Sequence, residues 1–116
     1  THRHSSAASD VYKRQEKIGC HYVCVSSGGN TPNPQIPIGP HYQVHLAKMI
    51  KDNTNIIIRA VGMISDPKKA NDIIINKDAD MVAMARAFLS NPRWVWDAAK
   101  ILNHPIDVPP QYARRL

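Results

Sequence analysis

The sequence predicts an α/β fold with parallel strands, and three observations lead to this prediction. Short apolar runs begin at residues 22, 56 and 81, and a segment with helical spacing comes after each of them. The runs at 56–61 and 81–85 are almost continuously apolar, as is typical of parallel strands that are buried on both faces. The intervals between the three starts suit repeated strand–helix units.

The first predicted unit begins with a β-branched and aromatic strand at residues 22–25. The strand ends at Ser26 to Gly29, a run that favours a turn. A loop with four prolines covers residues 32–40. Apolar residues then recur over residues 42–50 at the spacing of one helix face, so we expect a helix there.

The second and third units carry clearer boundary signals. The strand at 56–61 ends at Gly62, and Asp66 followed by Pro67 predicts the N-cap and first turn of the next helix. The strand at 81–85 comes next. Asn91 followed by proline predicts the start of a last helix, which the apolar pattern extends to residue 102.

Two architectures fit this order of elements. One is a small, open, doubly wound sheet, and the other is three consecutive units of an eight-stranded α/β barrel. A complete barrel needs roughly 250 residues, and this chain has 116. Three isolated parallel strands leave a sheet edge and one face uncovered.

Residues 1–15 differ from the rest, because they are polar and show no periodicity. The segment DVYKRQ at 10–15 resembles the translated end of a sequencing-library adaptor. We therefore expect residues 1–15 to be a leader outside the fold, either an adaptor-derived artefact or a natural disordered tail. The domain is expected to cover residues 16–116.

Charge and composition exclude several classes of function. The net charge is +6, but the basic residues are scattered and form no stripe, so we expect no nucleic-acid partner. The apolar stretches are too short to span a membrane, and no secretory signal is recognisable. Cys20 and Cys24 are expected to be reduced, buried thiols of a cytoplasmic protein. His41 and His45 have the spacing of a helical metal pair but no third ligand, so we expect no metal.

The chemistry is expected at the carboxyl ends of the strands, where ligands gather in parallel α/β folds. Glycines there let the backbone approach a ligand closely. An arginine beside a short helix can bind a phosphate through charge-assisted hydrogen bonds. The candidate residues at the three strand ends are Ser27, Gly28, Gly62, Met63, Ala85 and Arg86.

A series of segments from about residue 16 to the end resembles the C-terminal part of the Old Yellow Enzyme family, in the branch of bacterial NADPH dehydrogenases with ene-reductase activity. The segments are VSSGGN at 25–30, IPIGPHYQV at 36–44, AVGMI at 60–64, ADMVAMAR at 79–86, NPRW at 91–94 and QYAR at 111–114. The series departs from the family pattern at His41, His45 and Arg59. The resemblance implies a TIM barrel, of which this chain would be the last three βα units.

The resemblance also implies FMN as cofactor and NADPH as reductant, with hydride passing to the flavin and then to the activated C=C bond of an enone-type substrate. By resemblance, Ala85 and Arg86 bind the FMN phosphate. Gly62 and Met63 supply backbone donors, and Ser27 and Gly28 lie near the flavin.

Tyr112 and Arg114 resemble a C-terminal segment that enters the active site of a neighbouring subunit, which implies a homo-oligomer. The family's acid–base residues lie on earlier strands. We therefore assign no catalytic residue to this chain, and we expect it to be inactive alone. The alternatives are another barrel with a phosphate site, or a small stand-alone α/β ligand-binding or interaction module without catalysis.

Overall fold

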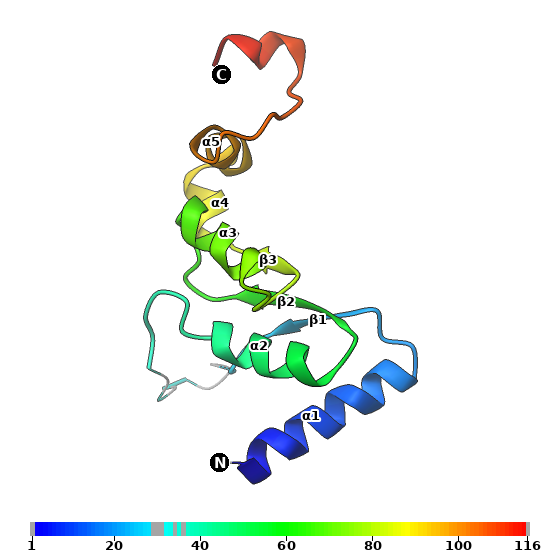
Figure 1. Cartoon of the computed structure of the whole chain (residues 1–116). Helices are drawn as coiled ribbons and strands as arrows, with labels where there is room; N and C mark the ends of the chain where they lie inside the picture. The colour runs from blue at the N-terminus through cyan, green and yellow to red at the C-terminus, as the bar shows by residue number, and fades with distance from the viewer. Residues whose placement is uncertain (1, 29–31, 34, 36, 116) are drawn as a thin grey trace.

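The computed structural model describes residues 2–28, 32–33, 35 and 37–115 (Figure 1). In chain order the elements are α1 (His2–Lys17), β1 (Tyr22–Val25), α2 (Val44–Asn53), β2 (Ile57–Val61), α3 (Pro67–Ile75), β3 (Met81–Ala83), α4 (Arg86–Ser90), α5 (Trp94–Ile101) and the 3-10 helix η1 (Pro110–Arg115). None of the helices in these ranges is both long and apolar enough to cross a membrane.

The three strands form one parallel sheet in the order β1-β2-β3. The predicted α/β class with parallel strands is therefore confirmed. Strand β3 ends at Ala83, two residues before the predicted end, because the chain turns there into the short helix α4. The carboxyl ends of the strands consequently lie along one edge of the sheet.

The register of the strands assigns their side chains to two faces. Val25, Ala60 and Val82 are register neighbours and lie on one face. Cys24, Arg59 and Met81 are register neighbours on the other face. We call the first the covered face and the second the bare face.

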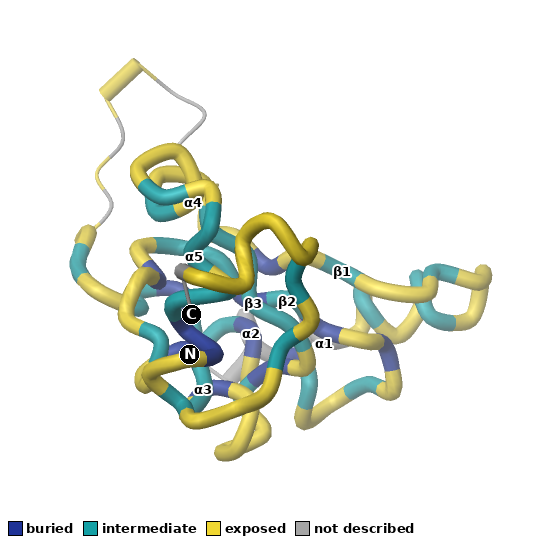
Figure 2. Tube along the Cα trace, turned by 90° about the horizontal axis from the view of Figure 1, so that it is seen from above, coloured by how far each residue is buried: buried dark blue, intermediate teal, exposed yellow. Residues whose placement is uncertain are grey.

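The hydrophobic core lies on the covered face, where α2 packs against β1 and β2, and α3 packs against β3 (Figure 2). Strand β2 is central, and Ile58 and Ala60 are completely buried. The buried core residues are Val25, Ala47, Ile50, Ile56, Ile58, Ala60, Ile64, Ala70, Ile73 and Ala79.

The predicted start of α3 is confirmed. The Asp66 carboxylate accepts a hydrogen bond of 3.0 Å from the N–H of Lys68, and Pro67 occupies the first turn of α3. The last helix begins later than predicted, because Arg93 and not Asn91 is the N-cap residue of α5. The Asn91 side chain accepts a 3.0 Å bond from the N–H of Arg93 in the turn before the helix. The indole of Trp94 donates to the carbonyl of Ser65 at 2.8 Å, so α5 is anchored to the loop after β2.

The N-terminal segment differs from the expected leader, because residues 2–17 form the helix α1. Helix α1 lies beside α2 in Figure 1 and contacts it. Tyr12 packs against the core, and the Glu16 carboxylate accepts a 3.3 Å bond from the N–H of Asn55. Residues 1–15 are polar on average, so the contact of Tyr12 with the core could not be predicted from their composition. The boundary at residue 16 and the origin of residues 1–15 stay predictions.

His41 has φ +60° and precedes α2, whereas His45 lies in the first turn of α2. The expectation that both cysteines are buried is wrong. Cys24 is exposed, because it lies on the bare face, and Cys20 is half-buried. No group of three metal-ligating side chains is found among the described residues.

Two adjacent prolines, Pro109 and Pro110, predict an extended C-terminal segment, but the structure has a 3-10 helix there. Pro110 begins η1, since a proline is tolerated in the first turn of a helix. The Tyr112 ring lies 5.4 Å from the Trp96 ring, and the Arg93 guanidinium lies 4.7 Å from the centre of the Tyr112 ring. These contacts fold the segment back onto α5.

Candidate functional site

A groove of about 470 Å³ lies at the carboxyl ends of β2 and β3. It is lined by residues 40–41, the loop 61–66, Lys69 and the turn 84–87. Four of the predicted site residues line it together, namely Gly62, Met63, Ala85 and Arg86. The structure thus brings together two sequence segments that are more than twenty residues apart.

At Gly62 the groove is lined by backbone atoms, because glycine has no side chain. Its φ is +121°, which residues with a side chain rarely adopt. A Cβ atom there would lie 2.7 Å from Nε2 of Gln43 and 2.9 Å from Cε1 of Tyr42. Met63 follows with φ +50°. Only glycine fits at position 62, and the backbone of this loop is open to a ligand.

Ala85 and Arg86 form the second wall. Ala85 precedes α4 and has no side chain that could cap it. Arg86 is exposed, and among the described residues its guanidinium has no hydrogen bond or ion pair. A free guanidinium beside unpaired backbone N–H groups suits an anion, and it matches a phosphate through two parallel hydrogen bonds.

Ser27 and Gly28 do not line the groove. The N–H and the hydroxyl of Ser27 donate to Oε1 of Gln43 at 2.6 and 2.7 Å. Gly28 is exposed, with φ +102° and no atom within 4 Å of an added Cβ. Gly29, the last residue of the predicted turn, lies outside the described residues. The loop after β1 is therefore placed beside the groove and held through Gln43.

Gln43 is a further residue of this region that was not predicted from the sequence. It is only 3% exposed, and its Nε2 donates to the carbonyl of Val61 at 2.8 Å. Its amide therefore joins the end of β1 to the end of β2. A buried side-chain amide needs hydrogen-bond partners for both its oxygen and its nitrogen. The signal in the sequence was a polar residue between Tyr42 and Val44, just where a helix begins.

Two further groove residues were also not predicted for this site. His41 lines the groove from the turn before α2, and Lys69 lines it from the first turn of α3. Asp66 is the acidic side chain of the groove, and its carboxylate already caps α3. The charges of the lining residues thus favour an anionic ligand.

Tyr112 and Arg114, the predicted interface residues, do not line this groove. Tyr112 packs on α5, as described above, and Arg114 is exposed. Their predicted place in a neighbouring subunit's site stays a prediction.

A parallel sheet with a groove lined by basic residues at its carboxyl edge is typical of α/β proteins that bind ligands there. A sequence model of the NADH:flavin oxidoreductase / NADH oxidase family matches residues 6–104. The chain belongs to this family of oxidoreductases. The resemblance to the Old Yellow Enzyme family that the motifs predict is confirmed, and the match begins within the expected leader.

Curated relatives agree with this assignment. The chain is 41% identical over 102 residues to the NADPH dehydrogenase of Halalkalibacterium halodurans, which covers 88% of this chain and 30% of that protein. It is 42% identical over 92 residues to the NADPH dehydrogenase of Clostridium acetobutylicum, covering 79% and 27%. The enzyme of the same name in Geobacillus thermodenitrificans is 39% identical over 102 residues, covering 88% and 30%. The chain spans about 30% of the length of these relatives.

Proposed function

We propose that this chain is the C-terminal part of an FMN-dependent NADPH dehydrogenase with ene-reductase activity, and that it forms the last three βα units of a (β/α)8 barrel. Family membership and the names of the relatives support this proposal. Three parallel strands with helices on one face are what three consecutive barrel units contain. The observation that carries the proposal is the groove in which Gly62, Met63, Ala85 and Arg86 converge.

The groove residues fit the phosphate end of FMN. The backbone around Gly62 and Met63 would donate N–H groups, because no Cβ blocks the approach at position 62. Arg86 would add a charged fork with no competing partner among the described residues. Ser27 and Gly28, held in place by Gln43, would border the flavin. When bound, FMN supplies the hydride chemistry from NADPH to an activated C=C bond of an enone-type substrate.

In this proposal the chain binds and orients the cofactor and supplies no acid–base residue. The complete enzyme would be a cytoplasmic homo-oligomer in which Tyr112 and Arg114 border a neighbouring subunit's substrate pocket. The contacts of Tyr112 with Trp96 and Arg93 support a fixed position for this segment. An interface suits these residues, because Tyr and Arg dominate binding energy at protein interfaces.

A second candidate is a stand-alone α/β module that binds a phosphorylated ligand without catalysis. The continuous core around α2 and α3 favours it, because the chain buries apolar residues without further strands. The barrel fragment and the stand-alone module differ in whether they need further strands to bind FMN tightly. A barrel fragment needs the other strands for tight binding, whereas a stand-alone module does not.

The test is a chimaera in which residues 16–116 replace the matching stretch of the Halalkalibacterium halodurans enzyme. Flavin fluorescence after equilibrium dialysis would give the dissociation constant of FMN. Arg86→Ala should weaken FMN binding about 10- to 150-fold, since a hydrogen bond to a charged group contributes about 1.5–3 kcal/mol. Arg86→Lys should restore only part of this, because an ammonium has no fork.

Lys100→Ala is the matched control, since it removes one positive charge from α5 outside the groove. Equal FMN retention by Arg86→Ala and Lys100→Ala would contradict the phosphate site. If the isolated chain bound FMN as tightly as the chimaera did, the stand-alone module would be the better account.

A further inference from the structure

Two basic residues of the groove have no role in the site described so far. His41 and Lys69 come from two different elements and line the same cavity as Arg86. Among the described residues, neither side chain has a hydrogen bond, an ion pair or a ring contact. Neither side chain is therefore used to hold the fold together.

The backbone of His41 makes its position unusual. Its φ of +60° lies in the left-handed region, which disfavours residues other than glycine by roughly 1–2 kcal/mol. The carbonyl of His41 accepts a 3.2 Å bond from the N–H of Val44, which a glycine would accept equally well. Backbone strain of this kind is concentrated at ligand sites. A histidine at this position is therefore less favourable than a glycine, and among the described residues its side chain makes no contact that compensates.

The charges around His41 favour a ligand with two negative charges. Arg86 and Lys69 are cations from α4 and α3, and Asp66, whose carboxylate binds the N–H of Lys68, is the acid that lines the groove. From α2, His45 is exposed and does not line the groove. A protonated His41 would make the lining still more positive, and a neutral one would still donate or accept one hydrogen bond.

We propose that His41 and Lys69, together with Arg86, bind the dianionic phosphoryl group of a phosphomonoester. The proposal rests on the proposed function, in which the phosphomonoester is FMN. The imidazole of His41 can donate a hydrogen bond to a phosphoryl oxygen, and the ammonium group of Lys69 adds a positive charge beside Arg86.

The experiment is an NMR titration of the isotope-labelled 116-residue chain, which detects millimolar binding. Sulfate is the first probe, because it is a dianion at pH 5.5, the pH of the titration. The amide signals of Gly62, Met63 and Arg86 report the dissociation constant.

The variants are chosen so that each has a matched control. Lys69→Ala should weaken sulfate binding about two- to fivefold, as expected for one solvent-exposed ion pair. Lys68→Ala, one residue away and outside the groove, should bind as the parent does. His41→Asn keeps a residue that tolerates the left-handed region but has a shorter side chain and no imidazole, so it should bind sulfate more weakly. His45→Asn, outside the groove, should leave sulfate binding unchanged.

His41→Gly serves as a second variant. Glycine adopts a positive φ without strain, so this substitution should not destabilise the backbone. It should bind sulfate more weakly than the parent at pH 5.5 while unfolding at the same or a higher urea concentration. Weaker binding without loss of stability would separate a ligand role from a structural one. Unchanged binding in His41→Gly would overturn the assignment of His41.

Inorganic phosphate, FMN and riboflavin complete the test. Phosphate and FMN should displace sulfate, whereas riboflavin, which lacks the phosphoryl group, should not. Displacement by riboflavin would refute the proposal. If Arg86→Ala loses sulfate binding while the His41 and Lys69 variants bind normally, this inference fails and the proposed site stands. If Arg86→Ala also binds normally, both fail.

Discussion

The two faces of the sheet contain similar residues but differ in what lies on them. On the covered face, Ile58 and Ala60 of β2 are completely buried under α2. On the bare face, Ile57 of the same strand is 48% exposed and Tyr22 of β1 is 51% exposed. Apart from Arg59, the sequence of β2 is apolar on both sides, as in strands with a layer on each face. The difference indicates that this sheet is suited to a second layer.

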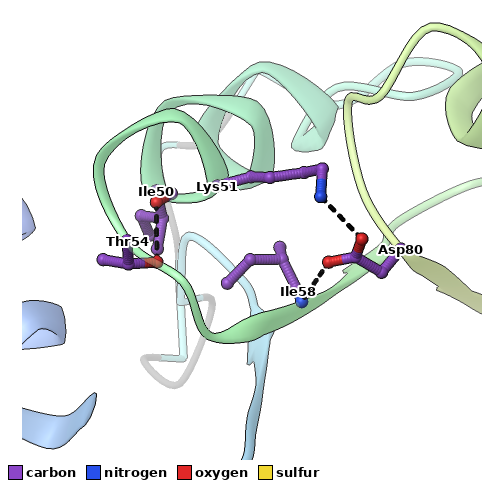
Figure 3. Close-up of polar contacts among 5 residues, drawn as sticks. All are labelled: Ile50, Lys51, Thr54, Ile58 and Asp80. Carbon is purple, nitrogen blue, oxygen red and sulfur yellow. Dashed lines mark hydrogen bonds and ion pairs between the residues drawn. The ribbon is translucent and has the colours of Figure 1, made fainter. Parts of the chain in front are cut away.

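Polar contacts hold the covering helix α2 at both ends. Near the amino end of β2, the Asp80 carboxylate binds Nζ of Lys51 at 2.6 Å and the N–H of Ile58 at 2.9 Å (Figure 3). At the carboxyl end, Gln43 joins Ser27 to Val61 just before α2 begins. Helix α2 is therefore fixed by apolar contacts along its length and by one polar contact at either end.

The bare face has a different kind of polar group. The Arg59 guanidinium lies 5.3 Å from the centre of the Tyr22 ring, and its Nε is buried without a hydrogen-bond partner among the described residues. A buried donor without an acceptor is unfavourable, because the hydrogen bond that it makes to water in the unfolded chain is lost. A further layer that supplied an acceptor for Arg59 would remove this penalty, which agrees with the proposal that the chain is part of a closed barrel.

The largest test of this comparison is a pair of substitutions on adjacent residues of β2. Ile58→Ala should lower the free energy of unfolding by about 2–5 kcal/mol, because it leaves a cavity under α2. Ile57→Ala should lower it by less than about 1 kcal/mol, since the side chain already meets solvent. Urea unfolding followed by circular dichroism measures both.

Ile58→Val is the milder variant if Ile58→Ala does not fold, with an expected loss of about 0.5–1.5 kcal/mol. Equal effects at positions 57 and 58 would mean that the two faces are equally covered, for instance by self-association. Sedimentation of the same samples would then identify the assembly.

A second pair of substitutions sharpens the comparison at the carboxyl end of the covered face. Gly62 and Gly28 both have positive φ, so alanine is strained at either position by roughly 1–2 kcal/mol. Only at Gly62 does the added Cβ also press on Gln43 and Tyr42, and overpacking adds about 1–3 kcal/mol. Gly62→Ala should therefore destabilise the chain more than Gly28→Ala, as the urea midpoints would show. The reverse order would contradict the close approach at Gly62.

The strands and four of the groove residues could be predicted from the sequence because their signals are local. Apolar β-branched runs that end at glycine mark β1 and β2, and Asp66-Pro67 marks α3. Parallel pairing then places Gly62 and Arg86 at one edge, so four groove residues follow from topology alone.

The features that were missed depend on contacts between distant residues. The hydrogen-bond partners of Gln43 lie 16 and 18 positions away, so its place between two apolar residues could mark it but could not identify those partners. The ring contact of Tyr112 with Trp96 turns a proline-rich tail back onto α5. The left-handed backbone of His41 is equally invisible in a sequence, since histidine is not the residue that usually marks it.

The smallest expected effect concerns the polar contact at the amino end of the covered face. Burial alone would raise the pKa of Asp80, but the Lys51 ammonium and the N–H of Ile58 outweigh it, so its pKa lies below the ordinary value of 3.8. The carboxylate form therefore stabilises the fold at neutral pH. This contribution is complete well above pH 3.8 and is lost as pH falls through the lower pKa of the folded state.

Asp80→Asn tests this contribution, because the amide keeps an acceptor for the N–H of Ile58 and removes only the charge. The stability difference between parent and variant should be below about 1 kcal/mol at pH 7, because the Asp80 side chain is 35% exposed and solvent screens the pair. The difference should shrink between about pH 5 and pH 3 as the parent's carboxylate is protonated. Asp52→Asn is the control, since its pair with Lys48 lies on the outer surface of α2, with both side chains about half exposed. Urea midpoints that stay equally far apart from pH 7 to pH 3 would show that the charge of Asp80 does not help to hold α2 on the sheet.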